Sequence, residues 1–201
     1  MRWTAPFLAF ALVGCAAQSA LAPAQWYSTQ DGVLPNGDNR AFVCHGFGCH
    51  YKSVYAFSPG DIATMRRIIG RPSSPAAERA LIQKMISWAE KRVAKTAGSA
   101  GDVGGLDMEN ARKRGQMDCI DEATNTTSYL LIAQENRLLR FHEVASPVAR
   151  GFFLDGRYPH ATAVIRNGEK TYAVDSWPQA NGVPPDVMPL EEWFEKSTAS
   201  S

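Results

Sequence analysis

The sequence lacks an excess of either charge, because its 21 Lys and Arg residues are balanced by 20 Asp and Glu residues, for a formal net charge of +1. The basic residues are also scattered along the chain. Nucleic-acid-binding domains usually carry a basic excess on one face, so we expect no nucleic-acid partner. With 201 residues, 45% of them hydrophobic, the chain is long enough to bury the core of one domain. We expect that domain to be monomeric.

Long apolar runs are also missing, with one short exception at Trp3–Val13. Following Met1 and Arg2, this run has the charge and length of a secretory signal, and it is too short to span a bilayer and stay there. We therefore predict that residues 1–22 are a signal peptide and that the protein is exported.

The end of this apolar run leaves two modes of export open. Residues 12–16, Leu-Val-Gly-Cys-Ala, have the pattern of a bacterial lipobox. In that case Cys15 would be lipidated and would attach the mature protein to a membrane, in the periplasm or at the outer membrane. Cleavage after Ala17 or Ala24 would instead release a soluble secreted protein.

The rest of the chain divides into a linker and one folded domain. Residues 23–40 are polar and contain the turn cluster Pro35-Asn36-Gly37-Asp38, so we predict a linker there, followed by the domain at residues 41–201. Inside the domain, start and stop signals predict helices from Ser58 to Gly70 and from Ser74 to Gly98.

Cysteine is scarce, with four copies in the chain. Cys44 and Cys49 lie near the turn of a hairpin that aromatic and β-branched residues predict between residues 42 and 57. In an exported protein such a pair is most simply a disulfide. The alternatives are c-type haem attached through this pair with His50, a zinc site that adds His45 and His50, or free thiols. The simplest interpretation needs no cofactor.

Cys119 lies where a loop rich in glycine and charge, residues 98–115, gives way to helix formers that extend to Glu135. The unpaired amides at a helix N-terminus carry roughly half a positive charge, which lowers the pKa of a thiol and favours the nucleophilic thiolate. Asp118, Asp121 and Glu122 partly offset this effect, because nearby anions raise the pKa of the thiol. Cys119 is therefore a candidate nucleophile that would depend on a separate base.

A base and its orienting group are predicted on a second hairpin. Asn167-Gly168 separates two β-prone runs, and this dipeptide is a strong signal for a two-residue type I′ turn. With that turn, His160 and Asp175 would lie directly opposite each other on adjacent strands, with Cβ atoms about 5 Å apart. An imidazole bonded to a carboxylate is the arrangement that activates a nucleophilic cysteine. His142 is a rival base without a predictable partner.

Further elements complete an α+β fold. The sequence predicts strands at residues 138–144 and 151–154, an extended loop at residues 178–189 and a short closing helix at residues 189–194. The helix that begins near Cys119 would then pack against an antiparallel sheet.

A cysteine that opens a helix, a histidine followed by small and β-branched residues on one strand, and an aspartate before an aromatic residue on the next strand resemble the transglutaminase-like branch of the papain-type cysteine peptidases. The bacterial transglutaminase-like cysteine proteinases are the set most similar to residues 116–194. The resemblance implies a papain-like fold in which the helix bearing Cys119 packs on the sheet bearing His160 and Asp175. It implies Cys119 as nucleophile, His160 as general base and Asp175 as orienting group.

The same resemblance suggests a chemistry. Papain-type enzymes use a side-chain amide upstream of the nucleophile to bind the oxyanion, which makes Gln116 a candidate for that role. The implied reaction is acyl transfer from a peptide or protein amide, either to water in a peptidase or amidase, or to an amine in a transglutaminase. A non-catalytic envelope module and a haem-dependent electron carrier remain as alternatives from other classes.

Overall fold

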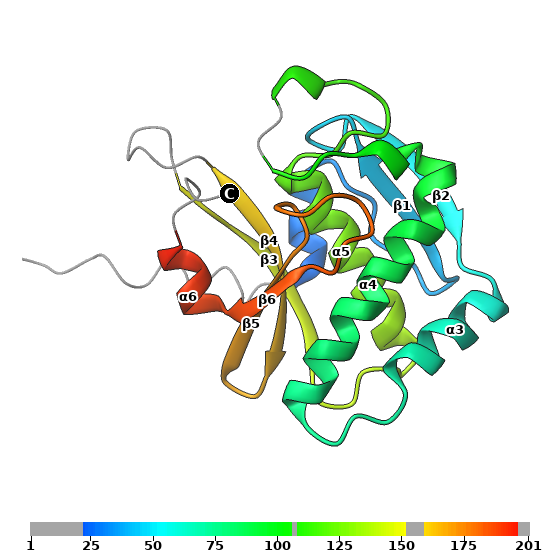
Figure 1. Cartoon of the computed structure of the whole chain (residues 1–201), viewed down its shortest axis with the longest axis vertical. Helices are drawn as coiled ribbons and strands as arrows, with labels where there is room; N and C mark the ends of the chain where they lie inside the picture. The colour runs from blue at the N-terminus through cyan, green and yellow to red at the C-terminus, as the bar shows by residue number, and fades with distance from the viewer. Residues whose placement is uncertain (1–21, 106–107, 152–158, 197–201) are drawn as a thin grey trace, which may run out of the picture.

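The computed structural model describes residues 22–105, 108–151 and 159–196, and Cys15 of the predicted signal peptide lies outside them. The chain has a mixed α+β fold with antiparallel sheets (Figure 1). Within the described residues, no helix combines the length and the apolar character needed to cross a membrane. The helices are α2 (Pro23–Thr29), α3 (Pro59–Ile69), α4 (Pro75–Ala97), α5 (Cys119–Glu135) and α6 (Leu190–Glu195). The strands are β1 (Arg40–His45), β2 (Tyr51–Ala56), β3 (Glu143–Arg150), β4 (His160–Asn167), β5 (Lys170–Asp175) and β6 (Asp186–Pro189).

Two antiparallel sheets pack against α5, which is the central element of the fold (Figure 1). One sheet is the β1–β2 hairpin, and the other has four strands in the order β3-β4-β5-β6. The helix α4 contacts α5 and the β1–β2 hairpin, α3 packs against α4, and α6 contacts β5 and β6. The main core lies where α4, α5 and the larger sheet meet, and includes Ile82, Met85, Ile86, Leu130 and Ile165.

The central position of α5 explains why even its polar residues are buried. The side chains of residues 124–128, Thr-Asn-Thr-Thr-Ser, are all buried and hydrogen-bonded. Asn125, for example, accepts from the amide of Cys44 and donates to its carbonyl. Because each of these groups has a partner, the cost of removing it from water is offset. The bonds also tie α5 to β1.

The predicted start and stop signals of α3 and α4 are confirmed. Ser58 caps α3 in a reciprocal capping box with Asp61, and the side chain of Ser74 accepts the first-turn amide of α4. The helices end where Gly70 and Gly98 follow. Local capping chemistry is therefore sufficient to set these boundaries.

The hairpin of β4 and β5 forms, but the predicted register is wrong. Asn167 pairs with Lys170, so the turn residues are Gly168 and Glu169. Gly168 has a φ of 59°, and glycine at the first loop position is typical of a type II′ turn. Asn167 stays in the strand, where its side-chain amide donates to the carbonyl of Phe141.

This register changes the relation between the two predicted site residues. Asp175 follows the Ala163–Val174 pair, which makes Asp175 a diagonal neighbour of His160 rather than its direct partner. The pairing has moved by two residues, and side chains alternate with a period of two, so both residues still lie on the same face of the sheet.

The edge strands also differ from the prediction. The strand expected at residues 138–144 lies at Glu143–Arg150 and includes Pro147, which cannot donate a hydrogen bond to a ladder. The strand tolerates this proline because it lies at the sheet edge and its pairing with β4 shifts between Ala145 and Val148, as in a β-bulge. The strand β6 lies inside the predicted loop, and residues 152–154 of the other predicted strand lie outside the described part of the chain.

Part of the predicted linker is folded against the domain. The helix α2 buries Trp26 and Tyr27. The indole N–H of Trp26 donates to the hydroxyl of Thr124 at 2.9 Å, and the hydroxyl of Tyr27 pairs with that of Ser128 at 2.7 Å. These contacts are with α5, so α2 belongs to the packed structure.

Candidate active site

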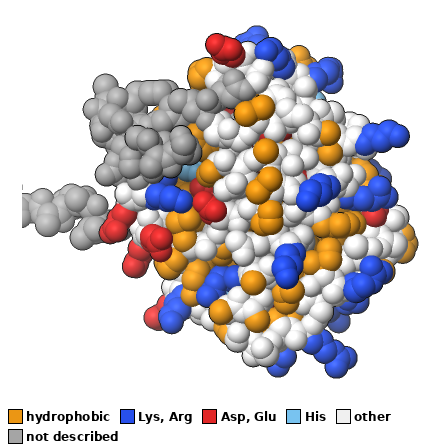
Figure 2. Space-filling model, viewed as in Figure 1, with side chains coloured by type: hydrophobic (Ala, Val, Ile, Leu, Met, Phe, Trp, Pro, Cys, Tyr) orange, Lys and Arg blue, Asp and Glu red, His pale blue; other side chains and the backbone are white. Residues whose placement is uncertain are grey.

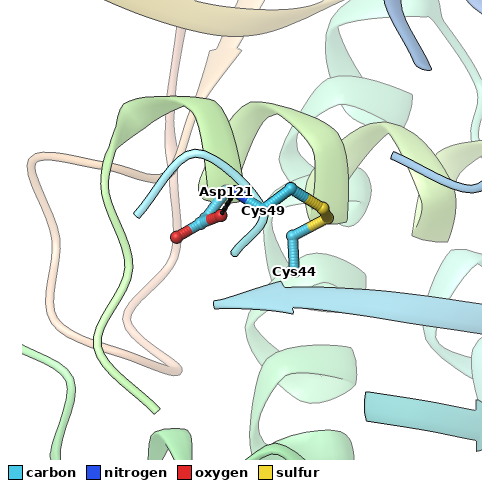
Figure 3. Close-up of side chains that lie close together, drawn as sticks. All are labelled: Cys44, Cys49 and Asp121. Atoms are coloured by element: carbon cyan, nitrogen blue, oxygen red, sulfur yellow. Dashed lines mark hydrogen bonds between the residues drawn. A yellow bond between two sulfur atoms is a disulfide. The ribbon is translucent and has the colours of Figure 1, made fainter. Parts of the chain in front are cut away.

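The predicted disulfide between Cys44 and Cys49 is present, and it joins the end of β1 to the turn before β2 (Figure 3). A sulfur in a disulfide has no thiolate with which to bind a metal or attach haem, so neither alternative fits this state of the protein. His45 is also engaged, because its Nδ1 accepts from the amide of Gly115 and its Nε2 pairs with the hydroxyl of Ser53.

The loop closed by this disulfide binds the N-terminal end of α5. The amides of Phe47 and Cys49 donate to the two carboxylate oxygens of Asp121, at 2.8 and 2.6 Å, and the amide of Gly48 donates to Asp118 at 3.1 Å. Figure 3 shows the Asp121 carboxylate beside Cys49. Phe47 and Cys49 have φ values of 70° and 58°, in a run of left-handed residues that forms a concave site for anions.

Asp118 caps α5 and makes Cys119 its first residue. The Asp118 carboxylate accepts the amides of Ile120 and Asp121, at 3.1 and 2.9 Å, and Asp121 accepts the amide of Asp118 in return. The amide of Cys119 is not among those that Asp118 accepts. Because a first-turn amide has no acceptor inside its own helix, this amide is suited to bind an oxyanion.

The sulfur of Cys119 lies against the backbone on both sides of His160. It is 3.8 Å from the carbonyl oxygen of Pro159, to which the thiol donates, and it interacts with the amide of Ala161. Cys119 is 7% exposed and belongs to an apolar cluster with Ala161 and Trp177.

The helix N-terminus does not activate this thiol as the sequence suggests. Burial, followed by the negative charge of Asp118, raises the pKa of Cys119 to about 12, although the amide of Ala161 lowers it. The loss of solvation therefore outweighs the helix dipole. At neutral pH the group is a thiol, so a nucleophilic role requires a base that takes its proton.

His160 and Asp175 are joined by a buried hydrogen bond. Nε2 of His160 is 2.7 Å from Oδ2 of Asp175, and their side chains are 2% and 6% exposed. The indole N–H of Trp193, on α6, donates to the same carboxylate oxygen at 2.8 Å. Since an ionised carboxylate only accepts, the proton of the neutral imidazole lies on Nε2, and Nδ1 carries a lone pair.

Two indole rings contact the imidazole of His160, with centroids at 4.5 Å for Trp177 and 5.2 Å for Trp193. Within the described residues, Nδ1 of His160 is buried and has no hydrogen-bond partner. The structure thus brings the imidazole and Asp175 together, and brings the sulfur of Cys119 to the adjacent backbone, without a bond between thiol and ring. Catalytic hydrogen bonds often tighten only when substrate binds.

Gln116, the predicted oxyanion donor, is engaged with the preceding loop. Its side-chain N–H donates to the carbonyl of Gly101 at 2.9 Å. The loop extends toward the site, because the amide of Gly105 donates to the carbonyl of Trp177 at 2.6 Å. This bond uses one of the two N–H groups of the Gln116 side chain.

Two buried carboxyl groups that were not among the predicted site residues link the site to α4. Glu90 on α4 and Glu122 on α5 are 4% and 3% exposed. Burial raises the pKa of Glu90 to about 7, and burial together with the charge of Glu90 raises the pKa of Glu122 well above its ordinary value. Glu90 accepts from the amide of Gly182 at 2.7 Å and from the side chain of Ser176. These contacts hold the segment after Asp175 against α4.

A periodicity signal for Glu90 was present in the sequence. Glu90 lies four residues after Ile86 and three before Val93, which are both buried. This spacing places Glu90 beside the apolar stripe of α4. Its burial was therefore predictable from the helical period, whereas its partners were not.

A second buried histidine–carboxylate pair was also missed. Nδ1 of His142 is 2.8 Å from Oε2 of Glu78, and both side chains are fully buried. The carboxylate also accepts the amides of Arg140, Phe141 and His142. Glu78 lies 64 residues before His142, so no local pattern could have paired them.

No family model, no curated protein and no solved structure matches this chain. The transglutaminase-like resemblance therefore depends on the residues of this chain alone, and function has to be argued from the geometry of the site.

Proposed function

We propose that the protein is an exported, cysteine-dependent acyl-transfer enzyme of papain-like, transglutaminase-like fold, with Cys119 as nucleophile, His160 as general base and Asp175 as orienting group. The observation that carries this proposal is the buried bond between His160 and Asp175, formed beside the backbone against which the Cys119 sulfur lies. Its expected substrate is a peptide or protein amide.

The proposed reaction begins with a thiol. The hydrogen of Cys119 turns from the carbonyl of Pro159 to Nδ1 of His160, the nitrogen that has no partner among the described residues. As that proton transfers, Sγ attacks the amide carbonyl carbon and an oxyanion forms. The protonated imidazole then gives the proton to the leaving amine, the C–N bond breaks, and a thioester remains on Cys119.

The second half of the reaction regenerates the thiol. A water molecule or an amine attacks the thioester carbonyl, Nδ1 of His160 accepts its proton, and the sulfur leaves and is reprotonated. Water gives a peptidase or amidase, and an amine gives a transglutaminase. Asp175 stabilises the imidazolium that forms in both halves.

The raised pKa of Cys119 defines what His160 must contribute. A thiol with a pKa near 12 supplies almost no thiolate at neutral pH, so attack depends on proton removal at the moment of reaction. General-base catalysis of this kind is worth about 10²- to 10⁴-fold in rate. The amide of Cys119 is the oxyanion donor that the geometry favours.

One observation favours a second candidate function, a non-catalytic binding module on the same fold. Cys119 is almost fully buried and its thiol is protonated at neutral pH, as in a structural cysteine. Under this alternative, the bond between His160 and Asp175 would serve stability alone.

Acylation by a small activated ester separates the two candidates. The full chain is mixed with p-nitrophenyl acetate, release of p-nitrophenol is followed, and the acylated residue is located by peptide mass mapping. The enzyme proposal predicts a thioester on Cys119, and a rate at least about 100-fold lower in His160→Gln. If acylation does not occur on Cys119, or if its rate is unchanged in His160→Gln, the enzyme proposal is wrong. The binding module is then the remaining candidate.

A further inference from the structure

Acidic residues are distributed unevenly between the interior and the surface. Seven carboxylates of the described residues are buried, namely Asp61, Glu78, Glu90, Asp102, Asp121, Glu122 and Asp175. No Lys or Arg of those residues is buried. The near balance of charge in the sequence therefore becomes a basic excess on the folded surface.

This excess is concentrated on α3 and α4. Residues 62–97 contain two acids, Glu78 and Glu90, and both are buried. The stretch exposes seven basic side chains, Arg66, Arg67, Arg71, Lys84, Lys91, Arg92 and Lys95, which we call the α3–α4 face. Figure 2 shows Lys and Arg side chains spread over the side of the molecule formed by these helices, whereas acidic side chains gather mainly on the side of α6.

Three lysines form a line along α4. Lys84, Lys91 and Lys95 are separated by seven and four residues, which keeps them within roughly 40° around the helix axis. Trp88 is half-buried and lies at a similar angle between them. None of these lysines is paired with a carboxylate of the described residues.

We propose that the α3–α4 face binds the anionic headgroups of a phospholipid bilayer. The face is a helix surface with positive charge along its length and no exposed carboxylate, which complements a plane of negative charge. Duplex nucleic acid is a competing polyanion, and a short DNA duplex therefore serves as a competing ligand in the experiment.

The number of basic residues is sufficient for such binding. Each Lys or Arg close to an anionic membrane raises the binding constant about fivefold. If Cys15 is lipidated, the face would add electrostatic attraction to a lipid anchor on the same protein. This binding is independent of the proposed acyl transfer.

Vesicle binding of the full chain tests the proposal. Partitioning is measured on phosphatidylglycerol and on phosphatidylcholine vesicles, at low and at high salt, for the wild type and for the variant Lys84→Gln, Lys91→Gln, Lys95→Gln. A matched control replaces three exposed basic residues on other elements, Lys113, Arg137 and Lys170, by Gln. Circular dichroism and the midpoint of urea denaturation report whether each variant is folded.

If the α3–α4 face binds the membrane, the triple lysine variant on α4 should lose roughly 100-fold in phosphatidylglycerol binding. The control variant at Lys113, Arg137 and Lys170 should lose less than about fivefold. Binding to phosphatidylcholine should be equal in all three proteins, and the preference for phosphatidylglycerol should vanish at high salt. Equal losses in the two variants, or no preference for phosphatidylglycerol in the wild type, would overturn the proposal. Tighter binding to a short DNA duplex than to vesicles would also overturn it.

Discussion

The pair of His160 with Asp175 and the pair of His142 with Glu78 have similar geometry and different surroundings. Both are buried, with nitrogen–oxygen distances of 2.7 and 2.8 Å. Glu78 also accepts three backbone amides, and the guanidinium of Arg79 lies 3.4 Å from Nε2 of His142. Both nitrogens of His142 are therefore engaged.

At His160 one nitrogen is bonded to Asp175, and the other has no partner within the described residues. The sulfur of Cys119 lies against the adjacent backbone. A histidine bonded to a carboxylate is thus not by itself a sign of catalysis. What distinguishes the two is whether the second nitrogen remains available as a base, and the following predictions test this distinction.

The largest expected effect is the loss of stability in Glu78→Ala. Burial alone would raise the pKa of Glu78, but bonds from His142 and the three amides outweigh it and lower the pKa. Removing this carboxylate leaves several buried donors unpaired, so the free energy of unfolding should fall by about 3–5 kcal/mol. Urea denaturation measures this loss, and the acylation rate of the folded fraction should stay unchanged. A stable variant with slower acylation would instead indicate that the pair of His142 with Glu78 serves catalysis.

Glu90→Gln should change the pH dependence of stability. The pKa of Glu90 is about 7 in the folded protein and about 4.5 in the unfolded chain, so the folded state retains a proton that the unfolded state releases. Stability should therefore fall by roughly 3 kcal/mol as pH rises from about 4.5 to about 7, and then level off. Gln keeps an acceptor for the amide of Gly182, and it should reduce this slope in urea titrations at several pH values. An identical slope in both proteins would contradict the assignment.

Trp193→Phe should separate the effect of the indole hydrogen bond to Asp175 from the effect of the ring packing against His160. Phe keeps an aromatic ring next to His160 and removes the N–H that donates to Asp175. We expect a loss of about 2 kcal/mol in stability, as for other bonds to charged groups, and slower acylation of Cys119. Trp88→Phe on α4 controls for the loss of an indole. If both variants acylate at the wild-type rate, the bond to Asp175 has no positioning role.

Some of the fold was predictable because its signals are local. Ser58 and Ser74 start helices through their own side chains, and Cys44 and Cys49 are close enough in sequence to suggest their bond. The register of β4 and β5 was not predictable. Gly168 can be the second residue of a type I′ turn or the first residue of a type II′ turn. The choice depends on the contact of Asn167 with the carbonyl of Phe141, which is distant in sequence.

The sequence was sufficient to predict which residues form the candidate site, but not to predict the pKa of Cys119. The spacing of His160 and Asp175 from the turn placed them on one face, and an error of two residues preserved that face. The pKa of Cys119 depends on burial by distant segments, so the helix dipole alone gave the wrong direction. The basic α3–α4 face was missed because the burial of Glu78 depends on Arg140, Phe141 and His142, which are distant in sequence.

The most direct test of the central claim is the rate at which iodoacetamide alkylates Cys119 at neutral pH, in wild type, His160→Gln and His142→Gln. The thiol is protonated, and Nδ1 of His160 has no hydrogen-bond partner among the described residues, so it is available to accept the proton. Alkylation should therefore be at least about tenfold slower in His160→Gln. The rate for folded His142→Gln should stay within about twofold of wild type. Equal rates in wild type and His160→Gln would contradict the account.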